Sequence, residues 1–495
     1  MMKTVKMRKI VSVLLSLVTA FSVTGVSSYA YAAGMESDAA ATSTSSEGSG
    51  SGKLTVTGQT LITDVFGDGQ KAWIAVLKYG TNIDPSSVST DDFEVENYDI
   101  ENVYVNTEAE LPDTSTEGEY VLIELKTDNY TTANYGGTGA TSSEKVAEAL
   151  EKAAAEGTSQ NDFKIPENES NDNIVSGNGG QMGRGTGVGF GSSSPSNQLT
   201  VTVRQTGDIS SADGAVIKGS QTEYATKYAD NENLLVQNFR QYTFTTQDGT
   251  EMMYSLYIPE DYDENTKYPL MTFMPDATGE GDDAYLALTE SLGASIWTTD
   301  ERQAKYRSIV LVPQYTDANS QNDEYTMELI QNIIDSYSVD ESRLYLSGQS
   351  SGTIRSIKLL IDYPDTFAAS MLTAGQADSA YVDSLSKLAD QKIWMICSAG
   401  DARAYPGMQA ITDAVEGAGT AVEISQWSAK LSDGEQEKLA AEQEETDSTI
   451  YWTVYDKGTV MRDDVTSNDA TEHMNTWRNS YTLDTVMDWV YSQTK

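Results

Sequence analysis

Histidine and cysteine are nearly absent from this chain of 495 residues, since each occurs once, as His473 and Cys397. A single cysteine excludes an intrachain disulfide. Cys397 ends the apolar run 393–397, which predicts a buried core thiol rather than a reactive one. The single histidine means that any reaction needing an imidazole has one candidate for it.

Positive charge is also scarce, because 32 Lys and Arg stand against 75 Asp and Glu, giving a net charge of -43 at pH 7. Such an acidic chain is repelled by polyanions, so nucleic acid and anionic lipid are excluded as partners. We attribute the charge to solubility outside the cell. The Gly-rich stretch 177–196 matches neither the dinucleotide fingerprint nor a P-loop, and we expect no cofactor and no metal.

The first 33 residues have the pattern of a secretory signal peptide. Four basic residues precede an apolar stretch over 10–26, and the small-residue pattern Ala30-Tyr31-Ala32 follows. Cleavage near Ala32 or Ala33 would release a secreted, extracellular protein. No later run of 18 apolar residues follows, so we expect no membrane contact after cleavage.

The composition then changes along the chain in three steps. Residues 34–53 are rich in Ser, Thr, Ala and Gly and predict a flexible spacer. Residues 54–219 carry short strands, such as 54–57, 72–77, 120–125 and 199–203, with turn residues between them, which predicts an immunoglobulin-like (Ig-like) β-sandwich. A disordered insertion interrupts it over about 131–197, with one helix candidate at 144–156.

Residues 233–495 have an α/β pattern. Segments 239–246 and 252–258 predict a hairpin around Asp248-Gly249. Helical segments then alternate with apolar strands, which we place at 270–274, 309–312, 344–346, 368–372, 393–397 and 450–455. This alternation predicts a mostly parallel sheet with helices on both faces, closed by a helix over 483–491.

The most informative motif is Gly348-Gln349-Ser350-Ser351-Gly352, which lies between the strand 344–346 and a helical stretch over 354–361. A G-x-S-x-G sequence in this context is typical of the nucleophile elbow of α/β-hydrolases. Asp401 follows the strand 393–397, and His473 comes later, so the order Ser, Asp, His is the order of that fold.

The chemistry explains why these three residue types are needed. Serine is a poor nucleophile at neutral pH, so an imidazole must take its proton, and a carboxylate must orient that imidazole. We therefore predict Ser350 as nucleophile, His473 as base and Asp401 as acid. Asp378, just beyond the strand 368–372, is a rival for the acid. Ser351 is the weaker candidate for the nucleophile, because the spacing of the elbow centres on Ser350.

Two backbone N–H groups should stabilise the oxyanion. One is predicted at Ser351 and the other in the loop after the strand 270–274. Pro275 has no N–H, so Asp276 or Ala277 must supply the second donor, and we favour Ala277.

The C-terminal half resembles a secreted esterase family that joins an N-terminal Ig-like domain to an α/β-hydrolase domain, close to polyhydroxybutyrate (PHB)-depolymerase-like, feruloyl-esterase-like and prolyl-oligopeptidase-like sequences. The resemblance rests on segments that cover most of 233–495, namely 268–273, 310–315, 348–352, 400–408, 457–460 and 472–477. The N-terminal half is similar through its strand pattern and Asp91-Asp-Phe-Glu-Val95. The resemblance implies Ser350, Asp401 and His473 as a triad and an ester as substrate. In that family the oxyanion loop usually opens with His-Gly or His-Asp, whereas this chain has Pro275-Asp276.

The sequence therefore predicts a secreted serine carboxylesterase that works through an acyl-enzyme. The resemblance suggests a small-molecule ester, or acyl or feruloyl groups on plant polysaccharide, as substrate. Two alternatives stay open, a prolyl-oligopeptidase-like serine peptidase and a catalytically decayed binding protein. No repeat of a β-propeller blade occurs in the N-terminal half. The sequence leaves the oligomeric state open.

Overall fold

The computed structural model describes residues 55–127, 199–316, 322–463 and 465–495. The predicted signal peptide, the spacer, the helix candidate 144–156 and the Gly/Ser-rich insertion lie outside these ranges. Among the described helices, none is long and apolar enough to cross a membrane.

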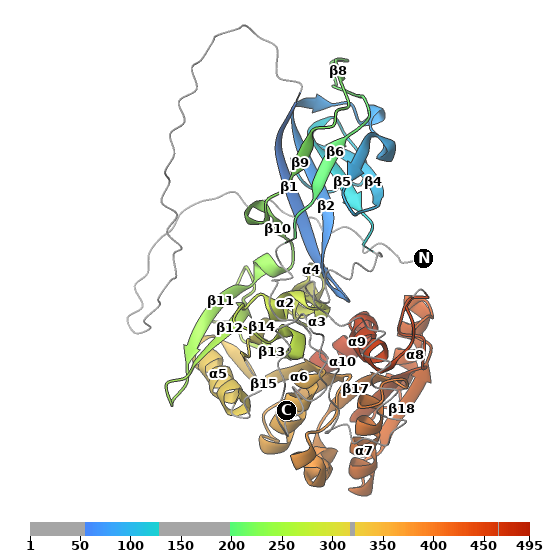
Figure 1. The fold of residues 1–495 in the computed structure, drawn as a ribbon. Helices are drawn as coiled ribbons and strands as arrows, with labels where there is room; N and C mark the ends of the chain where they lie inside the picture. The colour runs from blue at the N-terminus through green and yellow to red at the C-terminus, as the bar shows by residue number, and fades with distance from the viewer. Residues whose placement is uncertain (1–54, 128–198, 317–321, 464) are drawn as a thin grey trace, which may run out of the picture.

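The N-terminal part is a β domain, drawn in blue to green in Figure 1. Its five-stranded sheet has the order β10-β1-β2-β5-β4, and smaller sheets are formed by β3-β6-β9 and β7-β8. The strands are β1 (Val56–Phe66), β2 (Gly69–Ile83), β3 (Phe93–Val95), β4 (Ile100–Asn106), β5 (Gly118–Leu125), β6 (Thr202–Gln205), β7 (Ile209–Ser210), β8 (Val216–Ile217), β9 (Glu223–Ala225) and β10 (Glu232–Asn233). Leu77, Val121 and Val203 share one buried cluster, so the larger sheet packs against the three-stranded one as in a sandwich.

The C-terminal part is a nine-stranded sheet with the order β11-β12-β14-β13-β15-β16-β17-β19-β18. The strands are β11 (Arg240–Thr245), β12 (Glu251–Tyr257), β13 (Tyr268–Met274), β14 (Ile309–Pro313), β15 (Val339–Gln349), β16 (Ala369–Thr373), β17 (Ile393–Ser398), β18 (Val422–Trp427) and β19 (Ile450–Tyr455). The pairs β11–β12 and β12–β14 are antiparallel, and all pairs from β14 to β18 in this order are parallel. Gly249 has φ 89° in the predicted hairpin turn, a conformation that favours glycine.

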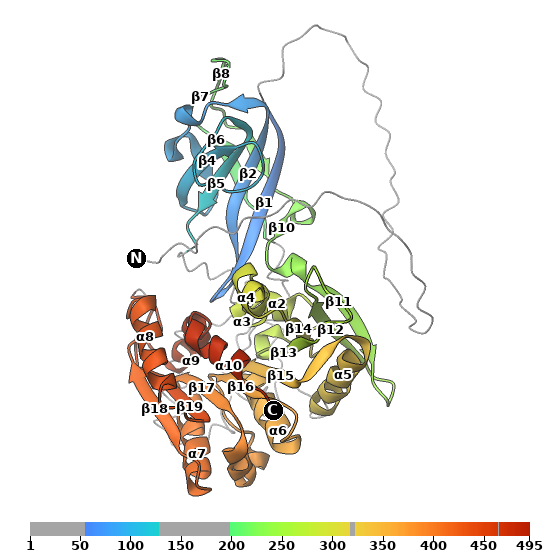
Figure 2. The same ribbon diagram turned by 180° about the vertical axis from the view of Figure 1, so that it is seen from behind.

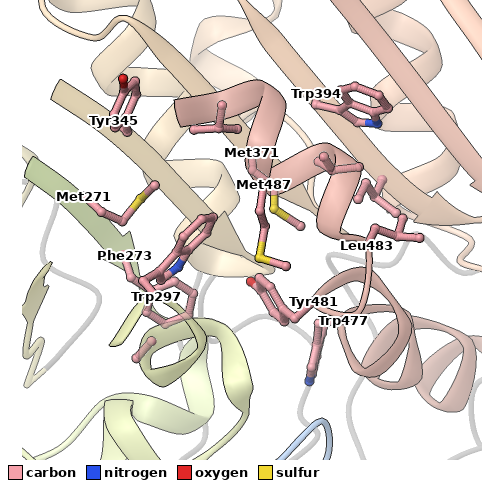
Figure 3. Packing of buried hydrophobic residues seen from close by; sticks show 14 of the residues in the cluster. Met271, Phe273, Trp297, Tyr345, Met371, Trp394, Trp477, Tyr481, Leu483 and Met487 are labelled. Atoms are coloured by element: carbon pink, nitrogen blue, oxygen red, sulfur yellow. The ribbon is translucent and has the colours of Figure 1, made fainter. Parts of the chain in front are cut away.

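Helices cover both faces of this sheet. They are α2 (Leu286–Thr289), α3 (Leu292–Ser295), α4 (Asp300–Lys305), α5 (Asn322–Ser336), α6 (Ser351–Asp362), α7 (Ala404–Gly417), α8 (Asp433–Glu444), α9 (Asp469–Ser480) and α10 (Asp484–Ser492). Side chains alternate between the faces along β13, so Met271 packs with α10 residues such as Met487, whereas Leu270 packs with α5 residues such as Leu329. Figure 3 shows the first of these two cores, with Phe273, Trp297 and Tyr481 near its centre. The predicted α/β-hydrolase fold is confirmed.

The sequence analysis missed seven strands, which are β3, β4, β7, β8, β9, β10 and β18. β18 forms one edge of the sheet, and most of its residues are half-buried or exposed, so it lacks the continuous apolar run that marked the inner strands. β3 has three residues, and β4 is mostly half-buried or exposed, with the adjacent polar residues Glu101 and Asn102 near its start. Short or half-exposed strands give weak signals because the predictive pattern is burial itself.

The β1–β2 hairpin reaches from the β domain to the α/β domain, where Figures 1 and 2 both show its tip beside α3 and α4. Val65, near the tip, belongs to the same buried cluster as Trp297. A Cβ added at Gly67 would lie 2.9 Å from the carbonyl oxygen of Arg478 in α9 and 2.7 Å from its Cγ. A Cβ added at Gly69, where φ is 108°, would lie 3.1 Å from the carbonyl oxygen of Glu290. The two domains therefore touch main chain to main chain.

We predict that Gly67→Ala destabilises this contact, because the new methyl group would overlap the main chain of Arg478. Overpacking of this kind costs about 1–3 kcal/mol. Gly58→Ala on β1 is the matched control, because its nearest neighbour would be Lys78 Cβ at 3.7 Å, an ordinary contact. Urea unfolding of both variants measures the difference, and equal stabilities would contradict the docking role of the tip.

Candidate active site

Ser350 lies at the sharp turn between β15 and α6, with φ 51° and ψ -118°. This conformation is unfavourable for a residue with a side chain, and such strain persists where the surroundings fix it. Those surroundings are tight, since a Cβ at Gly352 would lie 1.9 Å from the carbonyl oxygen of Met274, and one at Gly348 would lie 2.7 Å from Ser356 Oγ. Both glycines of the motif are thus required sterically.

The structure brings the three predicted residues together. Ser350 Oγ lies 2.8 Å from His473 Nε2, and His473 Nδ1 lies 2.5 Å from Asp401 Oδ2. Ser350 follows β15, Asp401 follows β17, and His473 lies on α9, so residues up to 123 positions apart meet at the carboxyl edge of the sheet. The indole of Trp477, one turn further along α9, meets the imidazole edge to face, with ring centroids 5.3 Å apart.

Asp401 is buried and accepts hydrogen bonds from the N–H groups of Arg403 (3.0 Å) and Ala404 (2.9 Å). Burial alone would raise its pKa, but His473 and these two donors lower the pKa below its ordinary value. Asp401 therefore stays ionised beside the imidazole. Asp378, the rival acid, accepts a hydrogen bond from Ala380 N–H instead and caps the 3₁₀ helix η9 (Ser379–Asp390).

A second buried acidic side chain, Glu472, anchors α9 next to the histidine. Gly458 N–H donates to it at 2.7 Å, Ser398 Oγ at 2.5 Å, and Ser467 Oγ donates as well. These bonds join the end of β17 and the turn after β19 to α9. In α9, His473 directly follows Glu472. Apart from its position next to His473, nothing in the sequence predicts this role of Glu472.

The predicted oxyanion donors lie on two elements beside Ser350. Ser351 is the first residue of α6, where main-chain N–H groups have no partner within the helix. Ala277 begins the 3₁₀ helix η7 (Ala277–Gly279), which Asp276 caps by accepting from Thr278 N–H (2.6 Å) and Gly279 N–H (3.3 Å). The N–H of Asp276 itself donates to Glu290 Oε1 at 3.3 Å. Of the two candidates in this loop, Asp276 thus has its N–H engaged.

The loop after β13 is bonded to the end of β15 and to α6. Gln349 Nε2, from the residue before the nucleophile, donates to Asp276 Oδ2 at 3.2 Å. Arg355 of α6 pairs with Glu280 at 2.8 Å, and its guanidinium group lies 4.4 Å from the ring centroid of Tyr315. The sequence analysis missed Glu290, Gln349 and Arg355, because no motif links them to the loop.

Cys397 is fully buried in β17, and its thiol accepts from Trp452 Nε1 at 3.3 Å. Burial raises the pKa of this thiol, so it stays protonated and belongs to the core as predicted. Within the described ranges, no three His, Cys, Asp or Glu side chains form a group that could hold a metal ion.

Comparison with known proteins relates both domains to esterases. Residues 58–218 match the family model of the esterase Ig-like N-terminal domain, and residues 306–433 match the model of esterase PHB depolymerase. Comparison with curated proteins gave no match.

A solved structure that covers both domains has a similar fold. The crystal structure of a thermostable esterase is 21% identical and has a TM-score of 0.63, and the match covers 89% of this chain and 100% of that chain. A CE1 ferulic acid esterase of Anaeromyces mucronatus and the feruloyl esterase module of Clostridium thermocellum are each 15% identical, with TM-scores of 0.33. Their matches cover 49% and 50% of this chain and 89% and 86% of theirs. The chain therefore carries an N-terminal domain that matches the esterase Ig-like model, followed by a domain of α/β-hydrolase fold that matches the esterase PHB depolymerase model.

Proposed function

We propose that the protein is a secreted serine carboxylesterase that works through an acyl-enzyme, with Ser350 as nucleophile, His473 as general base and Asp401 as the carboxylate that orients it. The observation that carries the proposal is the continuous chain of short contacts from Ser350 Oγ through His473 to Asp401. Such a chain is the arrangement in which an imidazole can take a hydroxyl proton as the C–O bond forms.

The reaction follows from this geometry. Ser350 Oγ attacks the ester carbonyl carbon while its proton passes to His473 Nε2, and the carbonyl oxygen becomes an oxyanion. The N–H groups of Ser351 and Ala277 stabilise that oxyanion. The imidazolium then gives its proton to the leaving alcohol, and the acyl group stays on Ser350. A water molecule, deprotonated by His473, repeats the attack and releases the carboxylic acid.

The substrate class is proposed from the resemblance. We favour acyl or feruloyl esters of plant polysaccharide or small soluble esters as substrates outside the cell. The peptidase alternative uses the same triad, so the leaving group distinguishes the two. We expect hydrolysis of p-nitrophenyl esters or methyl ferulate and none of a prolyl amide. Faster turnover of the amide would favour the peptidase.

We predict that Ser350→Ala lowers ester turnover by about 10³ to 10⁶-fold and leaves the fold intact, because the attacking oxygen is lost while neighbouring contacts remain. A fluorophosphonate probe should label the wild type and not this variant. Ser351→Ala is the matched control and should still be labelled, since it keeps its main-chain N–H. If labelling were lost in Ser351→Ala and kept in Ser350→Ala, Ser350 would not be the nucleophile. If the wild type were not labelled, the alternative of a catalytically decayed binding protein would be supported.

A second prediction separates the two candidate acids. Asp401→Asn should lower kcat by about 10⁴-fold, because an amide no longer holds the imidazole in the tautomer that accepts the serine proton. Asp378→Asn should keep the rate of the wild type, since Asp378 only caps η9. Steady-state kinetics on one p-nitrophenyl ester compares them, and a loss in Asp378→Asn alone would reverse the assignment.

A further inference from the structure

A pair of carboxyl groups lies behind the oxyanion loop, Asp276 at its start and Glu290 after α2. Asp276 is buried, and Glu290 is half-buried, with Oε1 bonded to the N–H of Asp276 and Oε2 to the hydroxyl of Thr278. Thr278 Oγ1 lies between them, 2.6 Å from Asp276 Oδ1 and 2.8 Å from Glu290 Oε2. A Cβ at Gly279 would lie 3.0 Å from Glu290 Oε2, so the loop packs directly on this acid.

The number of protons decides how these contacts can form. A threonine hydroxyl has one proton and can donate to one of its two carboxyl neighbours. The other contact is a hydrogen bond only if that carboxyl group is protonated and donates to the hydroxyl. One of the two acids must therefore carry a proton for the whole arrangement to be bonded.

The surrounding donors assign that proton to Glu290. Asp276 accepts from three N–H donors, those of Thr278, Gly279 and Gln349. Glu290 accepts from one N–H, that of Asp276, at 3.3 Å. Burial and the nearby charge of Asp276 raise the pKa of Glu290 well above its ordinary value. The bonds then run from Glu290 through the hydroxyl of Thr278 to Asp276.

We propose that Glu290, as the protonated member of the pair, is a positioning residue that holds the oxyanion loop for the reaction at Ser350. It acts through Asp276 N–H and Thr278, which flank Ala277, the proposed oxyanion donor. Asp276 is bonded in turn to Gln349, the residue before the nucleophile. The inference rests on the proposed serine esterase function and adds a residue to it.

Ionisation of Glu290 would break this arrangement by placing two negative carboxylates against one hydroxyl. Within the pair, Glu290 faces Asp276. Tyr481, in the turn after α9, faces both acids, and burial raises the pKa of Tyr481 further above 10. Asp68 and Lys71, which pair with each other at 2.8 Å, lie on the hairpin whose tip touches the main chain of Glu290. Because the pKa of Glu290 is raised in the folded state, the protonated form that completes the hydrogen bonds is present at low pH. This form, and the stability that it contributes, is lost as the pH rises through that pKa.

The test compares Glu290→Gln with Glu290→Ala on a p-nitrophenyl ester. The amide stays neutral and can still donate to Thr278 and accept from Asp276, so Glu290→Gln should keep kcat near the wild-type value. Glu290→Ala should lower kcat about 10 to 100-fold with little change in KM, somewhat less than direct loss of an oxyanion donor. Thr278→Val, which removes the linking hydroxyl at similar volume, should lower kcat in the same way and serves if Glu290→Ala does not fold.

Glu437→Ala is the matched control for loss of a half-buried glutamate. Glu437 likewise accepts from a threonine hydroxyl, Thr485 Oγ1 at 2.8 Å, and from the N–H of that residue at 3.1 Å, but it does so at the start of α10. Its removal should reduce stability without changing kcat of the folded enzyme.

The pH profile gives a readout that a merely structural role would not change. In the wild type kcat should fall as Glu290 ionises with rising pH, whereas Glu290→Gln should lack this fall. The proposal would be overturned if wild type and Glu290→Gln had the same alkaline pH profile of kcat. It would also be overturned if folded Glu290→Ala kept the wild-type kcat, or if kcat fell equally in Glu290→Gln and Glu290→Ala. Failure of wild type to show ester hydrolysis that depends on Ser350 would instead refute the proposed function.

Discussion

The arrangement of the site depends on one steric constraint, the close contact between the nucleophile elbow and the end of β13. Gly352 leaves no space for a Cβ against the carbonyl oxygen of Met274, so α6 begins directly behind the neighbouring strand. Because Ser350 is forced into a left-handed conformation there, its side chain projects beyond the sheet edge toward His473. The same contact places the loop after β13 beside Ser351. The nucleophile and the proposed oxyanion donors are thus positioned by a single approach of two main chains.

The sequence predicts which residues lie close together where those residues stand at the ends of strands. Ser350 and Asp401 each follow a buried apolar run, and in a parallel sheet the carboxyl ends of such runs meet at one edge. One histidine left no choice for the base. The inner strands were predicted because continuous apolar runs mark burial on both faces. The edge strand β18 was missed, because its side chains alternate between partial burial and solvent.

The supporting groups could not be predicted, because their roles depend on contacts between distant segments. Glu290 meets Asp276 from 14 positions away, and Glu472 joins segments as far as 74 positions apart. Gly67 and Gly69 look like ordinary hairpin glycines until the hairpin meets α9 and the main chain of Glu290. The contact between Gly69 and Glu290 also concerns how the two domains contribute to the active site. All the catalytic candidates lie beyond residue 233, yet the β domain touches the residue that we propose to hold the oxyanion loop.

Two carboxyl groups near the site, Asp401 and Glu290, differ in the hydrogen-bond donors that surround them, and the pKa values of the two shift in opposite directions. Asp401 receives two N–H groups and an imidazole, which outweigh the cost of burying its charge. Glu290 receives one long N–H bond and faces another carboxylate, so burial prevails and favours its neutral form. A neutral carboxyl group can donate a hydrogen bond, which an ionised one cannot. The only imidazole of the chain lies at Ser350. Behind the oxyanion loop, the group that we propose to donate a hydrogen bond to Thr278 is therefore a neutral carboxylic acid, Glu290.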